Sequence, residues 1–181
     1  MKIYTRSGDQ GDTGLFRGGR VAKDSAAPSA YGDVDEAQAA IGLARAYAGE
    51  MPKLHNLLTS LTRDLYVVMA DLATNPTKRD LLEPGASLVT AKMVSALEKE
   101  IDKATDQFDM PTDFVIPGHD VLSASLDLAR TVVRRAERSS LSAAATDSLA
   151  VPYLNRLSDL IWALARWVEQ DIETAKSGLD S

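Results

Sequence analysis

Cysteine is absent from the 181-residue chain, and histidine occurs only at His55 and His119. Without cysteine the protein can form no disulfide, thiolate nucleophile, iron–sulfur cluster or cysteine-based zinc site. Two histidines that lie far apart in the sequence cannot by themselves form a histidine-rich metal site. We therefore expect no metal site made by the protein alone, and we expect any metal ion to arrive with a ligand.

Long apolar runs are also missing, since no segment approaches the roughly 18 apolar residues that span a bilayer. The first residues, Met1–Arg6, lack the apolar stretch of a signal peptide. Hydrophobic residues make up 45% of the chain and charged residues 25%, which is the balance of one soluble domain with a sizeable core. We therefore expect a cytoplasmic protein of one domain with no membrane partner.

Positive charges are outnumbered, 20 to 26, and two short segments concentrate them. Residues 1–23 hold five cations against two aspartates, and residues 130–138 hold four arginines. An acidic body repels nucleic acid, whereas local clusters of cations attract a small polyanion. The charge distribution therefore predicts a small anionic ligand and no nucleic-acid partner.

Apolar residues recur at helical spacing through most of the chain. Glycine and proline mark the breaks, and Asp120 is a good cap for the fourth helix. The spacing predicts five helices and one polar connection, with the helices over about residues 29–48, 52–74, 87–106, 120–145 and 147–175 and the connection over 77–86.

Residues 1–24 differ from the rest of the chain because they hold five of its eleven glycines. We expect them to form a loop whose only extended piece is the stub Lys2–Thr5. The predicted fold is all-α, with this glycine-rich N-terminal loop, a five-helix bundle over residues 25–175 and a short tail over residues 176–181.

The segment Thr5–Gly14 combines glycines with hydroxyl side chains and nearby cations. Glycines let backbone N–H groups converge on an anion, and hydroxyls and cations complete a phosphate cradle. A Walker A loop is excluded, because Gly14–Gly19 is followed by Arg20 and Val21 where Lys and then Ser or Thr are required. The alternative to a cradle is a flexible, solvated N-terminal arm.

Arginines recur every four residues at Arg130, Arg134 and Arg138, so each lies about 40° around the helix from the one before it. Glu137 falls on the same side. Arginine suits planar, bidentate recognition of phosphate or carboxylate, and a glutamate can hold a guanidinium in place for that task. The alternative is an ordinary solvated face of an amphipathic helix.

The last predicted helix carries a polar stripe formed by Asn155, Asp159, Trp162 and Arg166 beside its apolar stripe. We expect Asp159 to lie opposite the arginines of the fourth helix, and Asn155 to offer an amide to a ligand or to a metal-bound water. An exposed helix flank is the alternative for Arg156 and Arg166.

Three carboxylates stand near the start of the first predicted helix. The positive end of the helix dipole is a sufficient explanation for Asp33 and Glu36. Asp35 could instead pair with an arginine.

These segments, in this order, resemble the PduO-type ATP:cob(I)alamin adenosyltransferases, a cobalamin adenosyltransferase family. The resemblance covers about residues 2–168, and its Arg-Arg-Ala-Glu-Arg and Asn-Arg-Leu-Ser-Asp blocks are rarely found together elsewhere. The matching blocks are Lys2-Ile-Tyr-Thr-Arg-Ser-Gly-Asp-Gln-Gly, Arg20-Val-Ala-Lys23-Asp24, Ala30-Tyr-Gly-Asp-Val-Asp-Glu36, Asp71-Leu-Ala-Thr74, Phe114-Val-Ile-Pro-Gly118, Ala129-Arg-Thr-Val-Val-Arg-Arg-Ala-Glu-Arg138 and Tyr153-Leu-Asn-Arg-Leu-Ser-Asp159.

The resemblance implies a homotrimer of helical bundles with active sites at the subunit interfaces. It implies that Co(I) of cob(I)alamin, or of a cobinamide-like precursor, attacks C5′ of ATP in the presence of Mg²⁺. The products would be adenosylcobalamin and triphosphate. A Co(II) reductase and an adenosylcobalamin-dependent acceptor enzyme would be further partners.

The resemblance also implies roles for individual residues. Asp35 would pair with Arg130 of a neighbouring subunit, and Phe114 would lie beneath the corrin and displace its lower axial base. The residues that would wrap the triphosphate are Thr5, Arg6, Ser7, Gly8, Thr13, Gly14 and Lys23. Those that would neutralise the leaving group or contact ATP are Arg134, Arg135 and Arg138, oriented by Glu137, together with Asn155.

The chain departs from the family in three places. His119 follows Gly118 where the family has a second glycine, Leu160-Ile161-Trp162 replaces an aromatic pair, and Glu169 stands where a late-helix asparagine is common. Two alternatives therefore accompany the enzyme hypothesis. One is a non-catalytic, ATP-responsive corrinoid carrier or regulator, and the other is a helical interaction protein whose arginines are surface charge.

Overall fold

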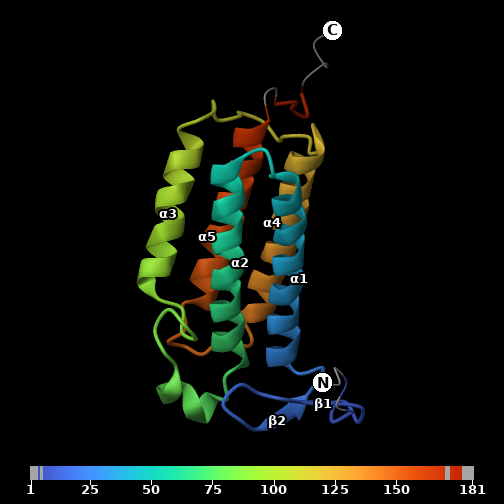
Figure 1. The fold of residues 1–181 in the computed structure, drawn as a ribbon, viewed down its shortest axis with the longest axis vertical. Coiled ribbons are helices and arrows are strands. Elements are labelled where there is room, and N and C mark those ends of the chain that lie inside the picture. The colour runs from blue at the N-terminus through green and yellow to red at the C-terminus, as the bar shows by residue number, and fades with distance from the viewer. Residues whose placement is uncertain (1–3, 5, 170–171, 177–181) are drawn as a thin grey trace.

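Five α-helices stand side by side in the computed structural model, which describes residues 4, 6–169 and 172–176 (Figure 1). The helices are α1 (Ala26–Tyr47), α2 (Pro52–Ala73), α3 (Ala91–Thr105), α4 (Val121–Ser140) and α5 (Ala150–Val168). A 3₁₀ helix, η1 (Pro76–Leu81), and two short strands, β1 (Asp12–Gly14) and β2 (Arg20–Ala22), complete the described elements. The predicted helical bundle is confirmed.

The core lies where α1 packs against α2 and α4, and where α5 packs against α4 and α3. Small side chains such as Ala30, Ala37 and Ala44 line the buried side of α1, so neighbouring backbones approach closely. α5 buries larger residues, among them Leu157 and Ile161. No helix in the described part of the chain is long and apolar enough to cross a membrane.

Three helices begin at different residues from those predicted, and one of them, α5, starts at Ala150 rather than near residue 147. α1 starts at Ala26 rather than near residue 29, because Pro28 fits in a first turn, where its missing N–H is not needed. α3 starts at Ala91 rather than at residue 87, because the Thr90 side chain accepts a hydrogen bond from the Met93 N–H and caps the helix there.

The last two helices end earlier than predicted. α4 stops at Ser140, where the hydroxyls of Ser139 and Ser140 both donate to the Ala136 carbonyl and compete with the helical backbone. α5 stops at Val168. Residues 173–175 instead pair as extended chain with residues 114–116, through hydrogen bonds from Ile116 N to Glu173 O (2.9 Å) and from Ala175 N to Phe114 O (2.8 Å).

The N-terminal segment contains an antiparallel hairpin and is not the plain loop predicted over residues 1–24. Thr13 of β1 pairs with Val21 of β2, and the turn uses Gly18 and Gly19 at φ of 94° and 89°. Strands of three residues are too short to leave an alternating pattern in the sequence. The predicted stub Lys2–Thr5 lies outside the described residues apart from Tyr4.

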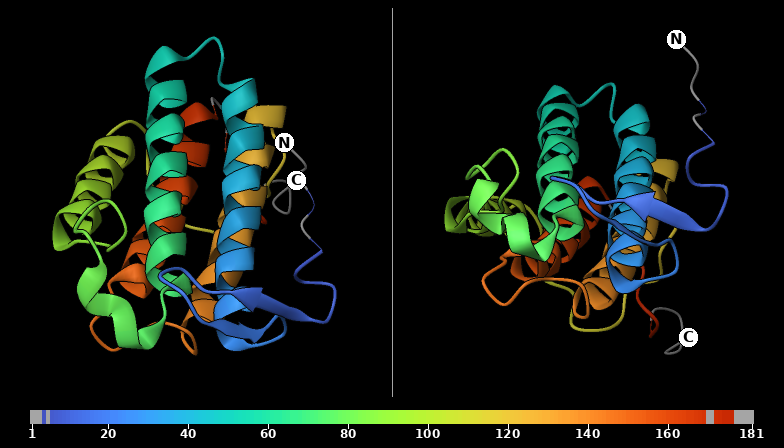
Figure 2. Two further views of the ribbon diagram at one scale, coloured as in Figure 1. Left: turned by 60° about the horizontal axis from the view of Figure 1, so that its bottom comes forward. Right: turned by 90° about the horizontal axis from the view of Figure 1, so that it is seen from below.

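The hairpin lies across the end of the bundle, beside the start of α1 and the end of α2 (Figure 2). Phe16 N donates to Ala73 O (2.9 Å), and Asn75 N donates to Phe16 O (3.1 Å). The Asn75 side chain donates to Gly18 O (3.0 Å). These bonds fasten the hairpin to α2, so the predicted phosphate segment is attached to the bundle.

The connection after α2 is the 3₁₀ helix η1 and not the plain polar segment predicted over residues 77–86. Arg79 Nη1 lies 2.9 Å from Oδ1 of the buried Asp71, and Val89 N donates to Oδ2 of the same carboxylate (3.1 Å). One buried aspartate therefore binds a group in η1 and a group just before α3, which fixes the path of the connection.

Removal of the α4 cap tests how the arginine-bearing helix is fixed at its start. Asp120 Oδ1 accepts from Leu122 N (2.7 Å) and Ser123 N (3.0 Å), and the Ser123 hydroxyl completes a capping box. We expect Asp120→Ala to lower the free energy of unfolding by about 1 kcal/mol in urea denaturation. Asp109→Ala, in the exposed preceding loop, is the control, and equal stability of the two variants would contradict the assignment.

Candidate active site

Arg134 and Arg138 lie on the exposed side of α4. Arg138 Nη1 donates to the Arg134 carbonyl (2.9 Å), and within the described chain neither guanidinium is paired with a carboxylate. The chain direction places the last turns of α4 at the end of the bundle that carries the hairpin (Figures 1 and 2). Two unpaired cations therefore lie at the same end as the predicted phosphate segment.

Arg135 points in a different direction from its two neighbours. It forms ion pairs with Asp33 (3.6 Å) and Glu36 of α1, and hydrogen bonding to Glu36 raises the pKa of its guanidinium. The dipole explanation for Asp33 and Glu36 is wrong, because α1 begins at Ala26 and leaves no acidic residue in its first turn. Arg135 thus joins α4 to α1.

Asn155 is held from both sides. Its Nδ2 donates to Glu137 Oε1 (3.0 Å) on α4, and its Oδ1 accepts from Arg156 Nη1. The same guanidinium lies 3.4 Å from Glu98 of α3 and 3.3 Å from Asp159. Asp159 therefore pairs with Arg156 and not with the α4 arginines as predicted. Arg156, which we considered as an exposed flank, fixes the Asn155 amide.

In the segment predicted to form a phosphate cradle, Lys23 and Arg20 make the contacts that hold the chain together. Lys23 Nζ lies 3.0 Å from the position that a Cβ on Gly8 would take, so a larger residue there would require the Lys23 side chain to shift. Arg20 donates to Asp12 Oδ2 (2.8 Å) and to the Ser7 carbonyl (2.7 Å). One guanidinium therefore holds residue 7 close to residue 12. Our site prediction did not include Arg20, because pairing across the hairpin was invisible in the sequence.

Other members of the predicted cradle lie close by in the chain. Thr13 and Gly14 form most of β1. Arg6 has a φ of 60° and places its guanidinium carbon 5.5 Å from the centre of the Tyr4 ring. Thr5 lies outside the described residues.

Phe114 is held at the opposite end of the bundle. The residue is 89% exposed, although its carbonyl accepts a hydrogen bond from Ala175 N. Three further apolar residues between positions 116 and 128 are exposed, namely Ile116, Val121 and Leu128. Exposed apolar residues that gather into a patch are typical of binding surfaces.

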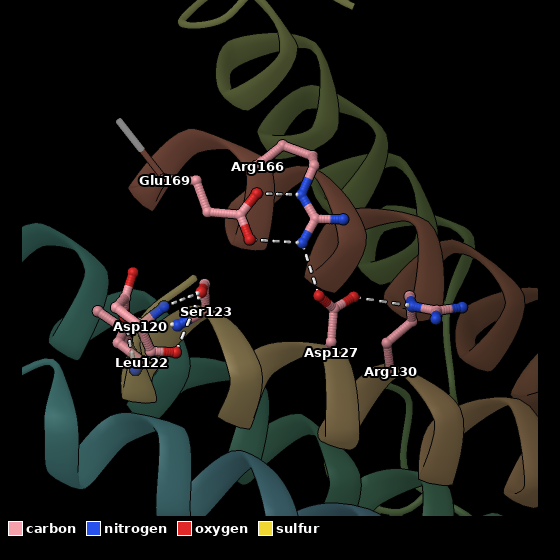
Figure 3. Close-up of polar contacts among 7 residues, drawn as sticks. All are labelled: Asp120, Leu122, Ser123, Asp127, Arg130, Arg166 and Glu169. Carbon is pink, nitrogen blue, oxygen red and sulfur yellow. Dashed lines mark hydrogen bonds and ion pairs between the residues drawn. The ribbon is translucent and has the colours of Figure 1, made fainter. Parts of the chain in front are cut away.

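Within one chain, Arg130 and Asp35 lie in two different surface recesses. Arg130 lies in a shallow recess with Gly118 and Leu128, and its Nε is 3.4 Å from Asp127 Oδ1 (Figure 3). Asp35 is exposed in a groove between α1 and α2, and the described residues offer it no ion pair. Their pairing across subunits stays a prediction.

Two of the three departures noted in the sequence fall inside the bundle, whereas His119 is exposed in the connection before α4. Leu160 and Ile161 are fully buried, and the Trp162 ring packs edge-on against Phe108, with ring centres 6.0 Å apart. Arg166 is buried rather than part of an exposed flank, and it pairs with Glu169. In the described ranges, no group of three or more histidines and acidic residues is placed to hold a metal ion.

Residues 3–168 match the family described as cobalamin adenosyltransferase. The chain belongs to this family. Corrinoid adenosyltransferase from Mycobacterium tuberculosis is 41% identical over 175 residues, which cover 94% of this chain and 90% of the relative. Corrinoid adenosyltransferase from Bacillus subtilis is 36% identical over 185 residues, which cover 99% and 90%.

Solved structures share the fold of this family member. A variant of the PduO-type ATP:corrinoid adenosyltransferase from Lactobacillus reuteri, complexed with cobalamin and ATP, superposes with a TM-score of 0.83 at 26% identity, over 95% of this chain and 98% of that one. A second variant, complexed with ATP, gives 0.79 at 29% identity, over 91% and 93%.

The Arg20–Asp12 pair predicts a pH dependence in the cradle. Hydrogen bonding to Arg20 lowers the pKa of Asp12 below its ordinary value of 3.8, so the charged pair persists above that pH and is lost as pH falls through the lowered pKa. We expect Arg20→Gln to raise the Asp12 pKa toward 3.8 in an NMR titration of the carboxyl carbon.

The control is Arg17→Gln, which changes an arginine of the same hairpin that pairs with Glu83 at 3.8 Å. It should leave the Asp12 pKa low. An equal rise in both variants, or a rise in neither, would contradict the role of Arg20.

Proposed function

We propose that this cobalamin adenosyltransferase family member transfers the 5′-deoxyadenosyl group of ATP to the Co(I) centre of a corrinoid. The observation that carries the proposal is the placement of Arg134 and Arg138, unpaired with carboxylates, at the end of the bundle where the hairpin lies. The structural relatives complexed with ATP and cobalamin support the same pair of substrates.

The reaction is a displacement at C5′. The cobalt electron pair forms the Co–C5′ bond, the C5′–O bond breaks, and its electrons leave with triphosphate, so cobalt is formally oxidised from Co(I) to Co(III). Because Co(I) is already a strong nucleophile, the protein needs no general base and no nucleophilic side chain. Its contribution is positioning, together with cations that bind the developing negative charge more strongly than the ground state.

The charged residues divide this work. Arg134 and Arg138 would bind the triphosphate as charge builds on it, and Lys23 and the backbone near Gly8 would hold its far end. Asn155 has one amide hydrogen committed to Glu137, which leaves the other for ATP. Mg²⁺ takes oxygen ligands, which the phosphates supply, so we propose that the substrate is Mg-ATP.

The corrin would lie on the apolar surface at Phe114. An exposed aromatic ring placed beneath cobalt would keep water and the lower axial base away and so favour a four-coordinate state. Cobalamin and a cobinamide-like precursor both present this corrin face. A reaction that reduces Co(II) must supply the substrate, and an adenosylcobalamin-dependent enzyme would take the product.

We propose that the active unit is a homotrimer whose sites form between subunits. Asp35 is exposed without an ion pair in the described chain, and the groove around it contains the small residues Ala39 and Gly42. The Arg130 guanidinium lies in the recess on α4, on a different surface of the subunit from the groove between α1 and α2. A contact between the two surfaces would give each carboxylate a guanidinium from the next copy.

The direct test is anaerobic. Mixing the protein with reduced cob(I)alamin and Mg-ATP should produce the spectrum of a light-sensitive Co–C bond and one triphosphate per adenosyl group. Binding of both ligands without a Co–C bond would assign the chain as a carrier. If ATP gave no rise in thermal stability, the chain would be an interaction protein, since ligand at 100 times Kd stabilises by about 2.7 kcal/mol.

Arg134→Ala should remove transfer without unfolding the protein. Loss of one preorganised donor to developing charge costs about 10² to 10³ in rate, and Arg134 makes no side-chain ion pair that the fold needs. Lys99→Ala, in the exposed face of α3, is the control and should keep full turnover. Retained turnover in Arg134→Ala would refute its role.

A further inference from the structure

A buried cluster of alternating charges connects the end of α5 to the middle of α4 (Figure 3). Arg166 is 2% exposed, and its Nη2 lies 2.6 Å from Asp127 Oδ2. Its Nε lies 2.8 Å from Glu169 Oε2. On the other side of Asp127, Oδ1 accepts from Arg130 Nε at 3.4 Å. The order of charges is therefore Glu169, Arg166, Asp127, Arg130.

The charges of this cluster balance only when Arg130 is included. A guanidinium away from water must be paired, and Arg166 is paired with two carboxylates. These three groups alone carry one negative charge in excess. Arg130 neutralises that charge, so the buried groups draw its guanidinium against α4.

The geometry then decides which edge of Arg130 remains free. Nε is committed to Asp127, whereas Nη1 and Nη2 have no hydrogen-bond partner within the described chain. The Arg130 side chain is 30% exposed and lies in the recess beside Gly118 and Leu128. Because a guanidinium is planar, fixing Nε turns the two-nitrogen edge outward.

We propose that Asp127 is a positioning residue for Arg130, and that the buried Arg166–Glu169 pair holds Asp127 in the orientation this requires. The outward edge of Arg130 is thereby preorganised to bind a carboxylate from a second copy of the chain. The inference rests on the proposed function, because the carboxylate is Asp35 of the neighbouring subunit at the proposed site. It also gives Glu169 a role, as the source of the excess charge that retains Arg130.

An NMR experiment tests the contact without any need for activity. In the full-length protein labelled with ¹⁵N-arginine, the Arg130 Nε–H signal is identified by its loss in Arg130→Lys. We expect Asp127→Asn to shift this signal and to speed its hydrogen exchange by about tenfold, as loss of a charged acceptor implies. Glu169→Gln should have a smaller effect in the same direction.

The control is Val133→Ala, which removes buried volume from α4 without touching the cluster. It should leave the Arg130 Nε–H signal in place. An unchanged signal in Asp127→Asn, or the same change in Val133→Ala, would overturn the proposal.

A double-mutant cycle tests whether Asp127 acts through Arg130. We expect Asp127→Asn to lower kcat/KM for the corrinoid by about tenfold in the natural chain and by less than about twofold in an Arg130→Lys background. The KM for ATP should hardly change. Equal losses in both backgrounds would overturn the proposal. If the natural chain forms no Co–C bond while the NMR result is as expected, the proposed function fails and the positioning role stands.

Discussion

The rotational setting of α4 is the constraint on which the candidate site depends. One side of this helix buries Leu126, Ala129 and Val133 in the core, so a small rotation would move arginines toward apolar neighbours. Three polar connections hold the helix at this setting, and they run from Arg135 to α1, from Glu137 to Asn155 and from Asp127 to Arg166. Arg134 and Arg138 lie on the exposed side of the helix, and within the described residues neither is paired with a carboxylate.

This division of labour suits a reaction whose nucleophile needs no activation. A site that neutralises a departing triphosphate requires cations in fixed positions more than it requires groups with shifted pKa values. The chain meets that need by fixing a side chain that would contact ATP through its neighbours. Glu137 and Arg156 both form hydrogen bonds with the Asn155 side chain. Phe114 precedes α4 and Arg138 lies near its end, so the proposed reaction requires ATP to extend along the site until C5′ reaches the corrin.

Helical periodicity predicted the bundle and the core, because a buried stripe repeats locally and is visible in a single sequence. The Asp120 cap was predicted for the same local reason and is confirmed. The hairpin was missed because its strands are three residues long. The early end of α5 and the Asp127–Arg166 pair were missed because their partners are distant in the sequence, 39 residues apart for that pair. Local sequence patterns therefore predicted which face of each helix is buried, but they did not predict which residues on other helices each face contacts.

A crystal structure of the protein bound to Mg-ATP measures directly whether α4 presents its arginines to the triphosphate. We expect phosphate oxygens within about 3 Å of the guanidinium nitrogens of Arg134 and Arg138, with the Gly8 segment and Lys23 against the same phosphates. A triphosphate bound away from α4, with both guanidiniums in solvent, would contradict this account.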